Sequence, residues 1–353
     1  MKLAAYFSRI IFLSVMGVFF LVISIDFIFA IIGQIKGISP TYTWVNAILY
    51  VLYRMPSDIN LIFPIAGFLG ALIGMSLLAA KSELIAMRAS GFSIAQMAGA
   101  MMMSGGVLLG VYFFLTLFLA PYTKHLAYFE QSASNRGDNV LVLSSQTWLK
   151  SGNHFLLIGQ VLPEGVANNV TDFVIDNGAL MEIRHIARIV LDGDHLWTLS
   201  EVTETHLSLT GVTQDYFSSV TEPSLISRTL LPIIAMQPDE MDIKTLYRYI
   251  HFREQNNLDV KQYNLQFWSR ILSPLMLPIM MLIAIPFVLG SIRTSTQIRL
   301  VVGLVVGFGF YIVSQFFGSL TLLSPLPPFW GAAVPPLAFG LLAWLLFYIV
   351  NRA

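Results

Sequence analysis

The stretch LIFPIAGFLGALIGMSLLAA (residues 61–80) holds twenty consecutive residues without one charged side chain, and the charged segment KSELIAMRASG (81–91) follows it. About twenty apolar residues are what a helix needs to cross the hydrocarbon core of a bilayer. Five further stretches have a similar length and character: 10–32, 95–120, 267–289, 298–320 and 329–350. We therefore expect six transmembrane helices, three before and three after a polar middle.

The composition supports a membrane protein. Apolar residues make up 56% of the 353 residues and charged residues 11%, against roughly 45–50% and about 25% in soluble domains. These values exclude a soluble globular protein and a disordered chain. The absence of cysteine excludes a disulfide scaffold and thiol catalysis. The formal net charge of zero gives no reason to expect a nucleic-acid partner.

The orientation of the helices follows from the basic residues of the short loops, which collect on the cytoplasmic side. With the N-terminus inside, seven basic residues fall on that side: Lys2, Arg9, Lys81, Arg88, Arg293, Arg299 and Arg352. The short loops on the other side offer Lys36 alone. We expect both termini in the cytoplasm and the polar middle outside, in the periplasm if the cell is Gram-negative. The first segment is too long for a cleavable signal peptide and should remain as an anchor.

Proline and glycine mark two features of the spans. Pro56 and Pro64 interrupt the second segment, so we predict a short interfacial helix over 44–54 that ends before the span itself. Two pairs of glycines, 70 with 74 and 303 with 307, have the spacing that lets helix backbones approach closely. Packing within one bundle is the favoured explanation, and a face shared with another membrane subunit is the alternative.

The polar middle has a different character. Between 122 and 262 there are 17 acidic and ten basic residues, a net of −7, and all six histidines. From about 140 to 220 apolar residues alternate with polar ones, and turn signals separate the runs, which is typical of an antiparallel sandwich or jelly roll. The apolar members are predicted to face inward: Phe155, Leu157, Phe173, Ile175 and Ile183. A helix over 239–257 follows, with Asp239 as the expected N-cap and Asp242 at N3.

Motifs for catalysis are missing. The sequence contains no P-loop, no H-E-x-x-H and no G-x-S-x-G, so a membrane-anchored hydrolase is disfavoured. His185, His195 and His206 would meet only if the strands brought them together, and scattered surface histidines are the simpler interpretation. We expect no metal site, no cofactor and no catalytic residue.

The segment 81–91 is predicted to form a short capped helix on the cytoplasmic side. Ser82 suits the N-cap, Glu83 the positive end, Arg88 the negative end and Gly91 the C′ position. Its apolar side chains add a surface that no span requires: Leu84, Ile85, Met87 and Phe92. Two interpretations remain open, a helix that rests on lipid and a coupling helix that docks into a cytoplasmic partner.

The run SELIAMRASG after FPIAGFLGALIG resembles the signature of the LptF/LptG family, the membrane subunits of the lipopolysaccharide-export ABC transporter. The resemblance extends through RMPSDINLIFP (54–64), YNLQFWSRILSPL (263–275), IPFVLG (285–290) and QFFGSLTLLSPLPP (315–328), and so covers nearly the whole chain. The Q-x-F-G and L-P-P pieces look closer to the LptG branch of that family.

The resemblance implies an α-helical integral membrane protein with six transmembrane helices and a periplasmic all-β domain, an open jelly roll. Residues 1–121 would hold helices one to three with the coupling helix at 82–91. Residues 122–262 would hold the periplasmic domain with its return helix, and 263–353 the last three helices.

It also implies a permease without catalysis of its own in the inner membrane of a Gram-negative bacterium. Its partners would be an LptF-type permease, two copies of an LptB-type ATPase that docks around Glu83, and an LptC-type single-span protein with a periplasmic bridge. Lipopolysaccharide would enter from the outer leaflet between span one of one permease and span five of the other, and then pass into the β domains.

Gate and phosphate contacts follow from this picture. Bulky or polar side chains near the seam are the gate candidates: Asp26, Phe27, Phe29, Phe310 and Phe317. The family often carries a basic residue late in span one, where this chain has Asp26, a residue that should face a protein interior or a wet cavity.

Lipid phosphates would instead meet Lys36, Arg54 or Arg270 near the outer interface. Interfacial snorkelling is an equal alternative for these residues, and for Arg54 a helix pair with Asp58 is another. A rival function is a mechanotransmitting ABC subunit that moves no substrate and signals to a periplasmic partner. That rival would have a filled β domain and no lateral cavity.

Overall fold

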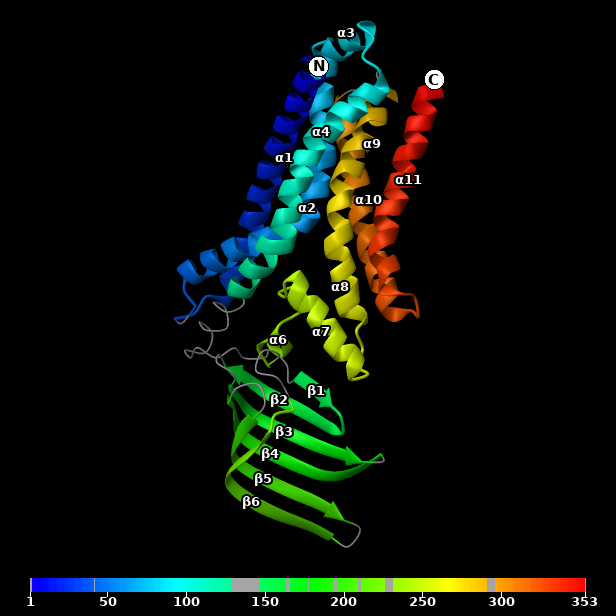
Figure 1. Ribbon diagram of the computed structural model, residues 1–353. Helices are drawn as coiled ribbons and strands as arrows, with labels where there is room; N and C mark the ends of the chain where they lie inside the picture. Colours follow the sequence, from blue (N-terminus) through cyan, green and yellow to red (C-terminus); the bar gives the residue numbers. More distant parts are fainter. Residues whose placement is uncertain are drawn as a thin grey trace. The chain divides into compact units, whose positions relative to one another are not determined.

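The computed structural model describes residues 2–352 apart from 41, 128–146, 163–165, 177, 193–195, 209–210, 226–230 and 291–295. The chain forms two compact units (Figure 1). The helical unit comprises Met1–Ile35, Val51–Lys124 and Lys261–Ala353, and the β unit comprises Lys36–Tyr50 and His125–Val260. Of the residues singled out above, Arg293 and His195 lie outside the described residues, as do 140–146 of the predicted β region.

Six helical segments among the described residues are long and apolar enough to cross a membrane, which confirms the six-span prediction. The first three contain α1 (Lys2–Gln34), α2 (Trp44–Ala80) and α4 (Ile94–Phe114), the last continued by the π turn η2 (Leu115–Leu119) to Ala127. The fourth joins α8 (Lys261–Leu272), η3 (Ser273–Leu275) and α9 (Met276–Gly290), and α10 (Thr296–Leu323) and α11 (Pro328–Arg352) complete the set.

The predicted break in the second segment is wrong. Helix α2 is continuous from Trp44 to Ala80, and Pro56 and Pro64 lie inside it. A proline removes one backbone N–H donor and clashes with the carbonyl four residues earlier. In a membrane helix, packing against neighbouring helices compensates for that lost hydrogen bond, so the helix can continue through the proline.

Both glycine pairs pack within this chain. A Cβ added to Gly70 would lie 2.4 Å from the Cα of Val15 in α1, so only a glycine permits that approach. A Cβ added to Gly303 of α10 would lie 2.6 Å from Cδ1 of Leu72 in α2. Helix α2 therefore packs against α1 on one side and against α10 on the other, as the first of the two explanations predicts.

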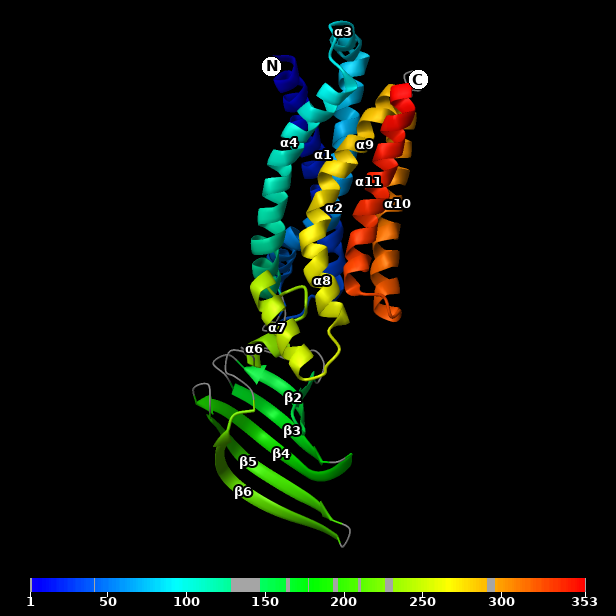
Figure 2. The ribbon, with the colours of Figure 1, turned by 45° about the vertical axis from the view of Figure 1, so that its right-hand side comes forward.

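The ends of the helical unit support one topology. The N-terminus, the short helix α3 (Glu83–Ala89) and the C-terminus lie at the same end of this unit in both ribbon views (Figures 1 and 2). An even number of spans requires the two termini to share a side, and the loop between spans two and three must share it too.

The described residues of the β unit form six antiparallel strands in sequential order. They are β1 (Thr147–Ser151), β2 (His154–Leu162), β3 (Val166–Asp176), β4 (Ala179–Asp192), β5 (Leu196–Ser208) and β6 (Gly211–Pro223). One of the turn signals that separate the alternating runs, at 151–153, connects β1 with β2. The all-β prediction is confirmed, and the six strands form one strongly curved sheet (Figure 2).

A row of irregularities folds this sheet. Asn169 and Glu201 have left-handed backbone conformations, with φ of 55° and 52°, and the buried side chains change parity there. On each side of this row, one set of buried residues is paired across β2, β3, β4 and β5. The first set is Ile158, Val170, Ile186 and Val202. The second set is Val161, Ala167, Ile189 and Leu199. The pairing register is the same on both sides of this row, so the irregularities form an aligned kink across neighbouring strands and add no extra residue to any of them.

The two halves of the folded sheet face each other. Register pairs Arg184 with Glu204 and pairs Glu222 with Trp197, seven residues further along the strands. Yet the guanidinium Nη2 of Arg184 lies 2.7 Å from Oε1 of Glu222. Such a contact requires β6 to curve back over the buried face, so the core of the β unit lies between the halves.

The strand residues that were predicted to face inward lie on the less buried face, because the buried face begins one residue along the strand. Leu156 and Ile186 are buried, whereas Phe155, Phe173 and Ile183 are paired across the strands on the half-exposed face. Leu157 and Ile175 are also only partly buried. Both faces of these strands carry apolar residues, so alternation alone did not identify the covered one, and the buried side chains change parity at the row of irregularities.

Helices α6 (Leu231–Ala235) and α7 (Ile243–Gln255) complete the β unit. The predicted helix is present, but its N-cap is Asp242, whose carboxylate accepts a hydrogen bond from the Thr245 N–H at 3.2 Å. The prediction of Asp239 was therefore one turn early.

Candidate functional site

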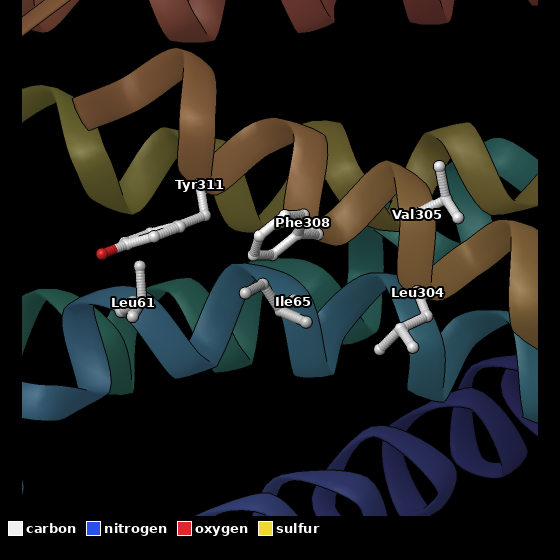
Figure 3. Close-up of a pocket in the computed structure, with 6 residues that line it drawn as sticks. All are labelled: Leu61, Ile65, Leu304, Val305, Phe308 and Tyr311. Atoms are coloured by element: carbon white, nitrogen blue, oxygen red, sulfur yellow. The ribbon is translucent and has the colours of Figure 1, made fainter. Parts of the chain in front are cut away.

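An apolar groove opens along the seam between α2 and α10. Its volume is about 530 Å³ (Figure 3). Six side chains line it: Leu61, Ile65, Leu304, Val305, Phe308 and Tyr311. Figure 3 shows side chains of α10 projecting toward Leu61 and Ile65 of α2, and Phe308 is 61% exposed. A surface without a charge suits hydrocarbon chains, which it contacts through dispersion.

Sequence reasoning missed this groove. Leu304, Phe308 and Tyr311 recur at i, i+4 and i+7 along α10, a helical stripe that was visible in the sequence. The opposing wall comes from α2, and only the packing of Gly303 and Gly307 against α2 brings the two stripes together.

The gate candidates are distributed over different surfaces of the helical unit. Phe29 of α1 is 68% exposed, and Phe27 and Phe317 are partly buried. Phe310 is buried, and its ring meets that of Phe339 in α11 edge-on at 5.5 Å. Its predicted place on the gate surface is therefore wrong, because a residue two positions from Phe308 lies about 200° around the helix.

Asp26 is half-buried in α1. One of its oxygens, Oδ2, is buried and has no hydrogen-bond partner among the described residues.

The three phosphate candidates have different environments. Arg54 lies 3.3 Å from Asp58, the helix pair that was one of the alternatives. Arg270 is only 4% exposed within the helical unit, so a phosphate would reach it only after the helices part. Lys36 is exposed in η1 (Ile35–Gly37) and belongs to the β unit.

The helix α3 has the predicted two turns but differs at its start. Ser82 occupies the N-cap position with φ of 58°, and its side chain caps no backbone N–H, which corrects the prediction. Glu83 instead accepts a hydrogen bond from the hydroxyl of Tyr6 in α1 at 2.9 Å. At the other end Gly91 has φ of 90°, and the N–H groups of Gly91 and Phe92 donate to the carbonyls of Arg88 and Met87. This is the Schellman arrangement that a C′ glycine permits.

The apolar side chains of this segment mostly face the helical unit. Leu84, Met87 and Phe92 are buried, and Phe92 meets Phe7 of α1 at a ring distance of 6.2 Å. Only Ile85 is exposed, at 62%. The prediction of four outward apolar residues is therefore wrong for three, because α3 is tethered to α1. Beside it a pocket of about 500 Å³ includes Gly91, Gln96 and Met103.

A charged cluster closes one end of the β core. The guanidinium of Arg184 lies 2.9 Å from Glu204, 2.7 Å from Glu222 and 3.7 Å from Glu182. Burial alone would lower the pKa of Arg184, but the hydrogen bond that Arg184 donates to Glu222 and the charges of Glu222 and Glu204 raise that pKa. Arg184 therefore stays charged and holds the two halves of the sheet together.

Asp172 lies beside this cluster in the register of the sheet. Its carboxylate is buried and accepts from His154 Nδ1 at 2.8 Å. Burial raises the pKa of Asp172, although the hydrogen bond with His154 and the charge of Arg184 act to lower it.

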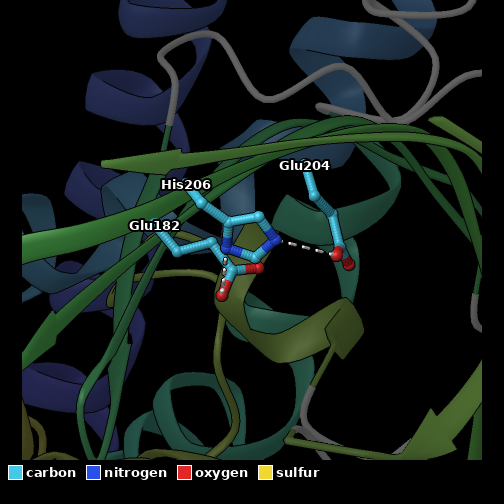
Figure 4. A group of neighbouring side chains, drawn as sticks. All are labelled: Glu182, Glu204 and His206. Atoms are coloured by element: carbon cyan, nitrogen blue, oxygen red, sulfur yellow. Dashed lines mark ion pairs between the residues drawn. The ribbon is translucent and has the colours of Figure 1, made fainter. Parts of the chain in front are cut away.

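Glu182, Glu204 and His206 bring their ligand atoms within 4.8 Å of one another (Figure 4). Figure 4 shows the imidazole between the two carboxylates. Arg184 already pairs with both carboxylates, so a metal ion would compete with a buried guanidinium. His185, which was considered with His206, is exposed and contacts the hydroxyl of Thr171 instead.

Comparison with known proteins gives one consistent result. The model of the family described as "Lipopolysaccharide export system permease LptF/LptG" matches residues 5–349. The "Lipopolysaccharide export system permease protein LptG" of Escherichia coli (strain K12) is 31% identical over 347 residues, which cover 97% of this chain and 96% of that protein. The protein of the same description from Haemophilus influenzae is 28% identical over 346 residues, with the same coverage of each chain.

Proposed function

This chain belongs to the LptF/LptG family of lipopolysaccharide export permeases, and on that premise we propose that it is the LptG-type subunit of an ABC transporter. It lifts lipopolysaccharide from the outer leaflet of the inner membrane and passes it toward a periplasmic bridge. The apolar groove between α2 and α10 is the observation that carries this proposal, because it offers an open, uncharged surface to acyl chains.

The partner permease covers the exposed faces of α1 and α10. Only 11% of the apolar window of the first span and 17% of that of the fifth are buried, against 72% for the second. Lipid or a second membrane subunit must therefore cover spans one and five. An LptF-type permease facing them places the groove and Phe29 beside the entry seam.

The ATP-hydrolysing subunits, two copies of an LptB-type protein, dock on the cytoplasmic side at α3. Glu83 and Ile85 are the side chains of α3 that the partner meets, since Leu84 and Met87 pack inward. The hydrogen bond from Tyr6 to Glu83 connects α3 to span one. A movement of α3 on ATP binding is therefore transmitted to the proposed gate helix, α1. The chain itself contributes no catalytic residue to this cycle.

The β unit lies in the periplasm in this proposal, next to the β domain of an LptC-type single-span protein. Its core is filled by its own side chains, among them Trp197, Ile186 and Leu199. The halves of the sheet must separate before acyl chains enter. The half-exposed set Phe155, Phe173 and Ile183 offers the other face of the sheet to neighbouring β domains.

The filled core is also the one observation that favours the mechanotransmitting alternative, in which the β unit signals and no lipid moves. The lateral groove between α2 and α10 argues against that alternative, because a signalling subunit has no need of an open apolar cavity.

The test is export by the reconstituted complex of both permeases and the ATPase. Phe308→Ser should reduce ATP-dependent lipopolysaccharide transfer while ATP hydrolysis persists. Phe118→Ser is the matched control, since Phe118 is equally exposed but lies outside the groove. Equal transfer by the two variants would contradict the role of the groove, and wild-type complex that hydrolyses ATP without moving lipid would favour the signalling alternative.

A further inference from the structure

A second pocket adjoins the apolar groove and, unlike that groove, is lined in part by amide and hydroxyl side chains. Its volume is about 350 Å³, within the range of roughly 300–1,000 Å³ of small-molecule sites. Leu61 and Tyr311 line both cavities, so the two share a wall. Residues of α2, α8, α10 and α11 surround the second pocket, all within the helical unit.

Uncharged polar side chains distinguish this pocket. Six of them line it: Asn60, Gln266, Ser269, Ser273, Ser314 and Gln315. Among the described residues, none of those that line the pocket is acidic or basic. A phosphate or an ammonium group would therefore lose its hydration without meeting a counter-charge, which is unfavourable inside a membrane protein.

The hydrogen-bonding capacity of the pocket includes both donors and acceptors. The side-chain carbonyl of Asn60 accepts from Thr116 at 3.0 Å, which leaves the amide N–H groups of Asn60 to donate. Ser273 donates its own hydroxyl proton to the carbonyl of Ser269, so the Ser273 oxygen remains an acceptor. Pro335 has no N–H to donate to the carbonyl of Gly331, the residue one turn earlier in α11.

We propose that this pocket binds the neutral linkage region of an acylated lipid, the ester or amide carbonyls and hydroxyls at the root of acyl chains that lie in the adjoining groove. Donors from Asn60, Ser314 and Gln315 meet the carbonyl oxygens, and the serine oxygens accept from hydroxyl or amide N–H groups. This inference rests on the proposed function for the groove.

Two lipids carry this chemistry, the exported lipopolysaccharide and an ordinary glycerophospholipid. The complex of this chain with its partner permease and ATPase is purified and equilibrated with one of three probes. These are lipopolysaccharide, an ester-linked phosphatidylethanolamine, and an ether-linked analogue with the same chains but no carbonyl groups. Bound lipid is counted by mass spectrometry.

The test variant is the double change Ser314→Ala with Gln315→Leu, and Ser269→Ala on the facing helix is a second, milder variant. Ser319→Ala is the matched control, because Ser319 is exposed on α10 outside the pocket. Loss of neutral hydrogen bonds should weaken binding of the carbonyl-bearing probe about three- to tenfold in the test variants. Binding of the ether analogue should stay unchanged.

The probe that loses affinity identifies the occupant as lipopolysaccharide, as phospholipid or as both. Unchanged binding of both carbonyl-bearing probes, or equal loss for the ether analogue, would overturn the proposal. ATP-driven release of lipopolysaccharide by the Ser319→Ala complex tests the proposed function separately. If that release fails while the complex still prefers carbonyl-bearing lipids, the proposed role of the pocket is supported and the proposed export role of the groove is refuted.

Discussion

The groove between α2 and α10 and the core of the β unit contain similar apolar side chains but are closed to different degrees. In the groove the aliphatic and aromatic residues are open, and Phe308 is mostly exposed. In the β unit they are covered by the folded sheet, and Arg184 binds its two halves together. The difference teaches that apolar composition alone does not identify a lipid-binding surface. What matters is whether the chain can cover that surface itself.

The largest effect is expected from removing Arg184. Its loss should loosen the covered β core and so make it more like the open groove. Arg184→Met leaves the partly buried carboxylates of Glu204 and Glu222 without their partner, and loss of two charge-assisted hydrogen-bonding contacts should destabilise the β unit by about 3 kcal/mol. Hydrogen exchange of β4–β6 in the full-length chain measures the loss. Arg188→Met, an exposed change on the same strand, is the control, and equal exchange in both variants would contradict the role of Arg184.

A second variant sharpens the comparison within the helical unit, where α2 packs closely on α1 at Gly70 and the groove opens along its seam with α10. Gly70→Ala puts a methyl group 2.4 Å from the backbone of Val15, so overpacking should cost about 1–3 kcal/mol. Gly106→Ala meets nothing within 4 Å and should be neutral or slightly stabilising. Detergent-solubilised thermal unfolding compares the two, and similar melting temperatures would rule out close α1–α2 packing.

The buried Asp172 should give the β core a pH dependence that the groove lacks. Burial raises the folded-state pKa of Asp172 above the ordinary value of 3.8. The folded chain then binds the proton more tightly, so this contribution is full below the unfolded pKa and is lost as the pH rises through the folded pKa.

Asp172→Asn should therefore flatten the decline of β-unit stability as the pH rises above 3.8, measured by urea unfolding at a series of pH values. Asp192→Asn, at the exposed end of β4, serves as the control. A decline that persists unchanged in Asp172→Asn would assign the titration to another group.

The smallest effect on stability is expected at α3. Ile85→Ser alters an exposed side chain and should change the unfolding free energy by less than about 0.5 kcal/mol. It should nevertheless weaken copurification of the ATPase, as should Glu83→Ala. Ile48→Ser, exposed in α2 but away from α3, is the comparison. Normal ATPase attachment in both α3 variants would refute the docking role of Ile85 and Glu83.

The sequence predicted the α3 segment only in part. Gly91 was correctly predicted to be the C′ residue, because glycine directly after a short helical run is a local signal for the left-handed conformation that ends a helix. The inward packing of Leu84 and Met87 was missed, since it depends on where α1 lies. The groove was missed for the same reason, because its stripe on α10 becomes a site only opposite Leu61 and Ile65.

The sequence by itself determined the number of spans, the presence of the strands and the family. Hydropathy, alternation and short motifs are properties of neighbouring residues, and the thickness of a bilayer sets the length of each span. Only the tertiary structure decided which face of each element is covered. The left-handed residues Asn169 and Glu201 mark where the buried face of the strands changes, and Gly70 and Gly303 decided which helices meet. Such choices depend on contacts between residues far apart in the chain, which no local pattern records.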